Sequence, residues 1–418
     1  MDAKAAEVPQ ADKDVLRGLA GEVAEIAALP VQQEKAEMWR RLNRLDSVRP
    51  MVWINEVCWE EIEGGEELQL RCTETFCRSQ EQQLRRLLYQ WRHMSADMTV
   101  DAKFWCDLVI RDSGYGMQAN EVRPEHRFGA ADYVPVIRSP RDVEKIRTPR
   151  ITVDRGATDR KYELMRDIYE GVMPVEKRGV VSFWMAPWDV LVRWYGISEL
   201  YADMYERPEL VHMAIDRLVE AMNGRLDQLE RQNAVSLNNC GVRVGAGGLG
   251  WSDELPQPDA EDGRVRLIDV WGNSTPQIFA QVSPEMHEEF ALQYERRFLK
   301  RFGLNCYGCC EPLHKKVHIL QSIPRLRRIS MSPWVDLAEG AAAVGDRYVF
   351  SYKPNPAVLA GDKWDPGGAR GMLIEAMEVA RGCHVEIIMK DISTLRGEPR
   401  RLWEWSRIAM EVAEDFSR

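Results

Sequence analysis

Residues 305–314 concentrate side chains that could bind a metal ion. Three of the nine cysteines and one of the seven histidines fall within this segment. It begins with apolar residues typical of a buried strand, so Cys309, Cys310 and Glu311 would lie where that strand opens into a loop. Thiolate and carboxylate groups are ligands that zinc and related metals accept. We therefore predict a metal site with Cys309, Cys310 and Glu311 as its ligands.

The alternative interpretation of this segment is structural, because cysteine is among the most buried residue types. Cys306 in particular is expected to face the core. The sequence has no second C-x-x-C motif, which argues against a closed structural zinc site and favours an open site completed by a substrate. Cys383 and His384, at the start of another apolar segment, are interpreted as structural. Glu285 and His287 are interpreted as a helix-capping acid and a surface imidazole.

Two lysines, Lys353 and Lys390, each follow an apolar segment that reads as a strand. A lysine in that position can hold an anionic group or act as a general acid. The alternative is an ion pair, and Asp391 is the obvious partner for Lys390. We take Glu56, Lys390 and Asp391 as the candidate catalytic residues.

Eight short segments have the apolar and β-branched composition of strands, and helical patterns lie between many of them. The segments are 51–56, 104–110, 180–185, 237–244, 304–307, 328–332, 348–352 and 385–389. The clearest helix is predicted over 208–222, and another is predicted to begin with Ser283 as its N-cap and to end at Gly303. This alternation predicts an α/β fold, a (β/α)8 TIM barrel. Residues 1–49 would form an N-terminal helical extension, residues 50–418 the barrel, and residues 245–264 a long inserted loop.

In such a barrel the chemistry takes place at the carboxyl ends of the strands. Aromatic and polar residues follow several of the predicted strands, and together they indicate a ligand site. The predicted substrate-binding residues are Trp53, Asn55, Trp184, Trp188, Trp271, Asn273, Gln277, Lys353 and Asn355. The four tryptophans would form apolar walls, and Asn55, Glu56, Asn273 and Gln277 would fix the orientation of the substrate.

The segment 245–250, Gly-Ala-Gly-Gly-Leu-Gly, formally matches the G-x-G-x-x-G motif of dinucleotide-binding proteins. That motif must open a helix, whereas acidic residues and Pro256 follow here. We therefore expect a mobile loop near the active site and no nucleotide.

Bulk properties exclude several classes of protein. The formal net charge is −10 and no basic stripe offsets it, which argues against binding to nucleic acid. No apolar run is long enough to span a membrane, and the first residues lack the apolar core of a secretion signal. An odd number of cysteines without disulfide-like spacing favours a reducing cytoplasm.

Several segments resemble the uroporphyrinogen decarboxylase superfamily. They are 50–53, 186–189 (Ala-Pro-Trp-Asp), 199–204, 207–211, 282–286 and 353–356 (Lys-Pro-Asn-Pro). The resemblance implies a (β/α)8 barrel with a funnel at its C-terminal rim. The superfamily contains decarboxylases and zinc-dependent methyltransferases that work with corrinoid proteins. Asn55 and Glu56 occupy the positions at which the decarboxylases have arginines. In the methyltransferases a His-x-Cys motif and a distant cysteine bind the metal. Tyr307 occupies the position of that histidine, and Lys390 and Asp391 lie where the distant cysteine would fall.

The resemblance, closest to the O-demethylase members, implies a methyltransferase that demethylates a small methoxylated substrate. Zn²⁺ would polarise the ether oxygen, and the methyl group would pass to a corrinoid. The chain lacks the Asp-x-His-x-x-Gly motif of corrinoid carriers, so the cobalamin would be carried by a partner protein.

Two alternatives stay open at this point. One is a metal-free decarboxylase or lyase that uses Lys390 and Asp391 as acid and base on a small carboxylated substrate. The other is a binding or scaffold barrel with a degraded site. The oligomeric state is also open, with a homodimer as one option.

Overall fold

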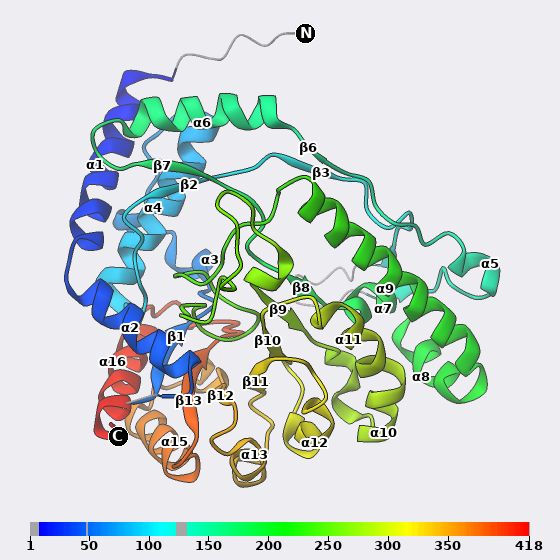
Figure 1. Ribbon diagram of the computed structural model, residues 1–418. Coiled ribbons are helices and arrows are strands. Elements are labelled where there is room, and N and C mark those ends of the chain that lie inside the picture. Colours follow the sequence, from blue (N-terminus) through cyan, green and yellow to red (C-terminus); the bar gives the residue numbers. More distant parts are fainter. Residues whose placement is uncertain (1–7, 47–48, 123–131, 418) are drawn as a thin grey trace.

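The centre of the protein is a seven-stranded sheet in which every neighbouring pair of strands is parallel (Figure 1). This computed structural model describes residues 8–46, 49–122 and 132–417. In sheet order the strands are β1 (Met51–Ile54), β13 (His384–Met389), β12 (Val349–Tyr352), β11 (Leu326–Met331), β10 (Leu304–Tyr307), β9 (Trp271–Ser274) and β8 (Trp184–Met185). The carboxyl ends of these strands meet at one edge, because all of them run in one direction.

The helices that follow the strands lie in an arc outside the sheet (Figure 1). They are α7 (Pro187–Tyr195), α8 (Ile197–Glu206), α9 (Pro208–Arg231), α10 (Pro284–His287), α11 (Gln293–Leu299), α12 (Val317–Leu320), α13 (Leu337–Val344), α14 (Ala357–Ala360), α15 (Pro366–Val379) and α16 (Arg400–Asp415). The predicted helix over 208–222 is confirmed and continues to Arg231. The predicted N-cap is also present, since the Ser283 side chain accepts a hydrogen bond from the backbone N–H of Met286.

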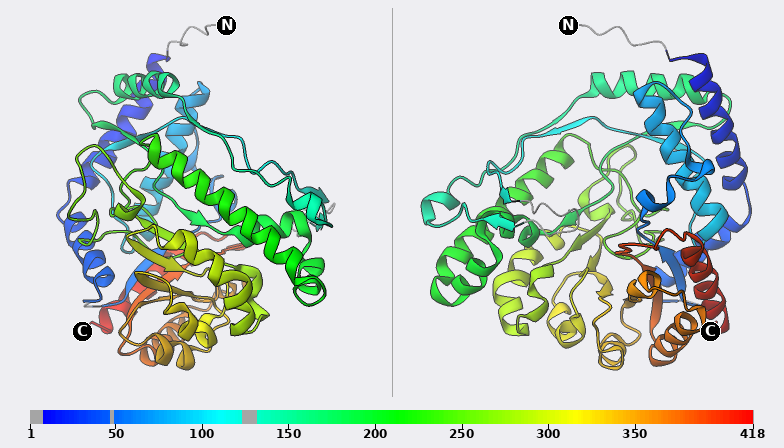
Figure 2. Two further views of the ribbon diagram at one scale, coloured as in Figure 1. Left: turned by 45° about the vertical axis from the view of Figure 1, so that its right-hand side comes forward. Right: turned by 180° about the vertical axis from the view of Figure 1, so that it is seen from behind.

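A second, smaller core lies beside the sheet. It joins α1 (Gln10–Ala27), α4 (Thr75–Met94) and α6 (Arg155–Tyr169) to a two-stranded sheet of β2 (Phe104–Asp107) and β7 (Val175–Arg178). The strand predicted over 104–110 therefore forms, but outside the central sheet. The predicted N-terminal extension contains α1 and α2 (Val31–Asn43), which pack along this core and the edge of the sheet at β1 (Figure 2).

Short elements connect the two cores. They are α3 (Trp59–Ile62), α5 (Pro140–Val143) and the antiparallel pairs of β3 (Ile110–Asp112) with β6 (Ile151–Val153) and β4 (Asn120–Val122) with β5 (Asp132–Val134). None of the helices in the described ranges has the length and apolar character needed to cross a membrane.

The strand predicted over 237–244 is wrong, and the strand β9 was missed. Asn238 explains the first error, because its side-chain amide binds the backbone of β9: Oδ1 accepts from Trp271 N at 2.8 Å and Nδ2 donates to Trp271 O at 3.1 Å. A side chain thus takes the place of a neighbouring strand. Gly272 explains the second error, since glycine weakens the sequence pattern of a strand. The structure requires glycine at this position, because a Cβ atom there would lie 2.4 Å from the Phe302 ring.

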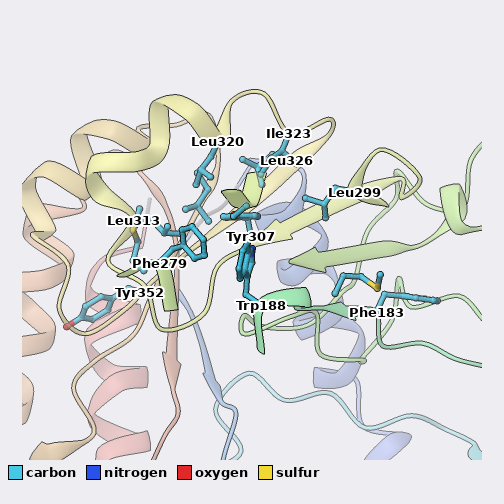
Figure 3. Close-up of a cluster of buried hydrophobic side chains, with 14 of the residues drawn as sticks. Phe183, Trp188, Phe279, Leu299, Tyr307, Leu313, Leu320, Ile323, Leu326 and Tyr352 are labelled. Atoms are coloured by element: carbon cyan, nitrogen blue, oxygen red, sulfur yellow. The ribbon is translucent and has the colours of Figure 1, made fainter. Parts of the chain in front are cut away.

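The outer face of the sheet packs on the helices. Alternate strand residues such as Ile329, Phe350 and Ile387 join helix residues in one large apolar core. Figure 3 shows a part of this core in which Trp188, Phe279 and Tyr307 lie together. The opposite, inner face of the sheet is more polar and leads to the edge at which the strands end.

A buried ion pair occupies the inner face. Arg328 Nε lies 3.3 Å from Glu386 Oε1, and both side chains are fully buried. The Gly-rich segment 245–250 folds onto this pair, because Arg328 donates to Gly248 O at 3.1 Å and Gly248 N donates to Glu386 at 3.2 Å. Residues 246–250 are buried. The expected mobile loop is therefore a buried turn that covers the ion pair.

The sheet is not closed by hydrogen-bonded strands within the described ranges, since β1 and β8 are its two edges. The side chain of Asn238 binds the backbone of β9, and the turn formed by residues 245–250 binds Glu386 of β13. The fold is thus a mixed α/β fold built on a parallel sheet.

Candidate active site

The thiol pair lies just beyond the carboxyl end of β10. Gly308 has φ +93°, a backbone conformation that favours glycine, and its N–H donates to Ser274 O at 2.8 Å. This turn brings Cys309 and Cys310 to the edge of the sheet, with their Sγ atoms 3.5 Å apart. Cys309 is buried and Cys310 is partly exposed.

Lys390, which follows β13, reaches this thiol pair. Its Nζ lies 3.2 Å from Cys309 Sγ and 3.9 Å from Cys310 Sγ. The same ammonium group lies 3.2 Å from Asp391 Oδ2. Two predicted metal ligands, Cys309 and Cys310, therefore lie beside the predicted catalytic Lys390 and Asp391, although 80 residues separate Cys310 from Lys390 in the sequence.

The charges of this cluster shift the pKa values of Cys309, Cys310 and Lys390. The hydrogen bond from the Cys310 thiol, helped by the ammonium groups of Lys390 and Lys353, lowers the pKa of Cys309 to about 7, although burial opposes the shift. The pKa of Cys310 is raised, because that thiol donates to Cys309 and is desolvated. Burial acts to lower the pKa of Lys390, but the nearby Cys309 and Cys310 sulfurs and Asp391 outweigh it and raise the pKa. The arrangement favours a Cys309 thiolate beside a Lys390 ammonium.

Glu311 is fully buried and its two carboxylate oxygens are already engaged. Oε2 accepts from the backbone N–H of Cys309 at 2.7 Å, and Oε1 accepts from Thr275 Oγ1 at 2.7 Å. The carboxylate therefore holds the loop after β10 against the end of β9. Its observed role is to position Cys309.

Glu56, Asn55 and Asp391 form the solvent-exposed side of the cluster. The Asp391 backbone N–H donates to Glu56 Oε2 at 3.1 Å. Arg243, which comes from the segment before the Gly-rich turn, donates to Asn55 Oδ1 at 2.5 Å and lies 3.9 Å from Glu56. The cluster thus contains both signs of charge at a surface that a substrate can reach.

A second acid lies at the end of β8. Asp189 Oδ2 accepts from Gln277 Nε2 at 2.9 Å. Burial, with the neighbouring Glu311 charge, raises the pKa of Asp189 to about 6, although the Gln277 hydrogen bond opposes the shift. Trp184 of β8 is 39% exposed, and its predicted role in substrate binding stays a prediction.

Three predicted substrate-binding residues have structural roles. Trp188 is fully buried and its ring centroid lies 4.8 Å from that of Phe279. Trp271 is buried on the inner face, where its Nε1 donates to Gly250 O at 2.9 Å. Asn355 accepts a hydrogen bond from the backbone of Ala357 at 2.9 Å. The prediction that Trp188 and Trp271 form the walls of the site is wrong, because both are core residues.

Three more predicted substrate-binding residues, Trp53, Asn273 and Lys353, lie on the inner face. Lys353 is 1% exposed and its Nζ donates to Ser330 Oγ. Asn273 is 2% exposed, and both polar atoms of its amide have no hydrogen-bond partner among the described residues. The half-buried Trp53 likewise has an Nε1 without a partner there.

Neither histidine near the predicted site joins the thiols. His314 lies 3.7 Å from Glu339 of α13. His287 is fully buried, so its prediction as a surface imidazole is wrong; its Nε2 lies 2.7 Å from the Tyr307 hydroxyl. Tyr307 in turn donates to the buried Glu295 at 2.6 Å. Cys306 is fully buried, as expected.

The donor groups do not fit a zinc ion held by Cys309, Cys310 and Glu311. Zinc requires three or four ligands that converge on one point. No group of three His, Cys, Asp or Glu side chains converges in this way in residues 8–46, 49–122 and 132–417. Both oxygens of Glu311 are engaged, and an ammonium group lies 3.2 Å from Cys309. Cys309, Cys310 and Glu311 therefore do not form a zinc site in this arrangement.

Two residues of the site, Arg243 and Asp189, are not among the predicted site residues, although Asp189 lies in the 186–189 segment noted above. The role of Arg243 cannot be predicted from the sequence, because no pattern in an irregular segment indicates which strand end a residue will contact. Asp189 does carry a signal, since it follows a strand beside two tryptophans. A buried acid at a strand end is a recurring feature of active sites.

One comparison with solved structures supports this architecture. The sequence matches no protein-family model and no curated protein. The structure is similar to a methyltransferase from Methanosarcina mazei, with a TM-score of 0.51 and 11% sequence identity. The match covers 90% of this chain and 98% of the other. The two proteins therefore share a fold over nearly their whole lengths.

Proposed function

We propose that the protein is a methyltransferase that removes the methyl group from a small methoxylated substrate at the Cys309–Lys390 cluster. The similarity in fold to a methyltransferase supports this class of reaction. We also propose that the parallel sheet is a (β/α)8-type barrel that is open between β1 and β8. The cluster would then lie at the carboxyl ends of the strands, where barrel enzymes hold their substrates.

The observation that supports the chemistry is the Lys390 ammonium group at the edge of the sheet. A methyl ether is a poor methyl donor because its leaving group is an alkoxide or phenoxide. Lys390 can donate a hydrogen bond to the ether oxygen and stabilise the negative charge of the alkoxide or phenoxide that leaves as the methyl group goes to the acceptor. The leaving group then takes its proton from water, and Lys390 stays an ammonium. Asp391 and Cys309 hold the ammonium in place.

The methyl acceptor would be a corrinoid carried by a partner protein. A reduced corrinoid supplies a strong nucleophile for an in-line displacement. Trp184 and Trp334, which follow or end strands of the sheet, are 39% and 74% exposed and would contact such a partner. Asn55 and Arg243 would orient the substrate, because they face each other across the rim.

The experiment combines the purified protein, a reduced corrinoid protein and a panel of methoxylated arenes. We expect a methyl-cobalamin absorption spectrum together with the demethylated product by mass spectrometry. The variant Lys390→Met should lower the rate at least about 100-fold. Lys363→Met, at an exposed lysine, is the control and should leave the rate unchanged. If no methoxylated compound yields either signal, the proposal is refuted.

A decarboxylase or lyase is the second candidate, because one observation favours it. Lys390 and Asp391 lie 3.2 Å apart and Arg243 reaches the same rim, so an acid, a base and a carboxylate-binding group are together. Release of carbon dioxide from small carboxylated substrates without corrinoid would support this function over methyl transfer.

A further inference from the structure

The cation beside the thiol pair is a side chain of the protein, the ammonium group of Lys390. Lys390 Nζ lies 3.2 Å from Cys309 Sγ and 3.9 Å from Cys310 Sγ. A second lysine approaches from the neighbouring strand, since Lys353 donates to Ser330 Oγ and this hydroxyl donates to Cys309 O at 3.3 Å. Both lysines are at least nine-tenths buried, so solvent does little to screen them.

The same geometry limits what a metal ion could find there. The two thiols are adjacent in the sequence and Asp391 is paired with Lys390. Glu311 is held by Cys309 N and Thr275 Oγ1. A dication between the thiols would gain at most two firm ligands and would lie close to a fixed ammonium group of like charge.

We propose that Lys390 replaces a metal ion at this site, so that its ammonium group is the permanent counter-ion of a Cys309 thiolate and the site works without zinc. This inference concerns the site of the proposed function but does not depend on methyl transfer. A thiolate held in this way reacts with soft, neutral alkyl electrophiles. Iodoacetamide is such a probe, because a sulfur–carbon bond forms at Cys309 as iodide leaves.

The first test is the zinc content of the wild-type protein. The full chain is incubated with zinc under reducing conditions, desalted, and analysed by elemental mass spectrometry. We expect less than about 0.1 zinc per chain, because fewer than three ligands converge. Close to one zinc per chain, lost in Cys309→Ser, would overturn the proposal. This measurement needs no folded variant of Lys390, and it is independent of whether methyl transfer is observed.

The second test is the rate at which iodoacetamide modifies Cys309, followed by peptide mass spectrometry. Lys390→Met should slow the modification about tenfold, because the counter-ion is lost. Lys390→Arg keeps the charge and should keep most of the rate. Lys363→Met is the matched control, and its rate should equal that of the wild type. An unchanged rate in Lys390→Met would overturn the proposal.

Discussion

The backbone N–H of Asp391 donates a hydrogen bond to Glu56 Oε2 over 3.1 Å, which ties the loop after the last strand of the sheet to the loop after the first. Asp391 has φ +56°, an uncommon conformation for a residue other than glycine. Such backbone strain persists where the surroundings hold it, and it is often found at functional sites. Glu56 is one of the groups that hold it here.

Loss of this hydrogen bond should affect activity more than stability. Glu56→Ala is expected to lower the rate of methyl transfer about tenfold, because the loop that carries Lys390 and Asp391 loses an anchor. The Glu56 side chain is exposed, so the melting temperature should change by only a few degrees. Glu56→Gln can still accept from Asp391 N and should keep most of the activity. An equal loss in both variants would show that the charge, and not the hydrogen bond, is required.

A third thiol in place of Lys390 should create a metal site. Lys390→Cys removes the ammonium and adds a ligand on the strand end that faces Cys309 and Cys310. We expect zinc uptake to rise to about one ion per chain after desalting, measured by elemental mass spectrometry. The double variant Lys390→Cys/Cys309→Ser should lose this zinc. No uptake in the single variant would mean that position 390 does not face both thiols.

The Gly-rich turn should tolerate no side chain at Gly248. A Cβ atom there would lie 2.3 Å from the Trp39 ring and 2.9 Å from Glu386. Gly248→Ala is therefore expected to lower the free energy of unfolding by about 1–3 kcal/mol, measured by urea denaturation. Gly18→Ala is the matched control, because an added methyl there meets no atom within 4 Å. Trp39→Leu should cost less in the Gly248→Ala background than alone.

Stability should depend on the buried Glu295. Burial raises the pKa of Glu295 to about 8 in the folded protein, above its ordinary value of 4.5. A raised pKa means that folding favours the protonated form of Glu295. The contribution of this protonation to the free energy of unfolding is therefore complete below pH 4.5 and is lost as the pH rises through about 8. The upper bound of this contribution is about 5 kcal/mol.

The measurement is urea denaturation of the wild type and of Glu295→Gln between pH 5 and pH 9. Glutamine can still accept the hydrogen bond from Tyr307, and its stability should vary less with pH. Glu209→Gln, at an exposed acid in the first turn of α9, should follow the wild-type curve. If Glu295→Gln loses stability with pH as steeply as the wild type, Glu295 is not the titrating group.

Sequence reasoning was most successful where strands are continuous apolar runs. The strand predicted over 304–307 has those bounds in the structure, and those predicted near 328–332, 348–352 and 385–389 differ from β11, β12 and β13 by one or two residues. It failed at β9, whose Trp-Gly-Asn-Ser sequence lacks β-branched residues. That strand forms because its neighbours bury it, and such an effect is tertiary.

In the candidate site, too, some features follow from local sequence patterns and others depend on tertiary contacts. The strand ends predicted Cys309, Lys390, Asp391 and Glu56, because parallel strands bring their carboxyl ends together. They could not predict that Lys390 points at Cys309 or that Glu311 is engaged by the backbone, since both depend on side-chain directions in loops. The tryptophans misled for a related reason: an indole in a predicted loop can line a site or fill a core, and Trp188 and Trp271 fill the core.

The position of β1 beside β13 has a consequence for synthesis. The only sheet partner that β1 has in the described ranges is the last strand to be made, and Glu56 and Asp391 are 335 residues apart. A ribosome that adds about 5–20 residues per second would need roughly 15–70 s to cover that distance. Throughout this interval the nascent β1 must remain unpaired, with its backbone donors and acceptors exposed to other chains. The first strand is therefore open to pairing with other chains until the last strand is complete.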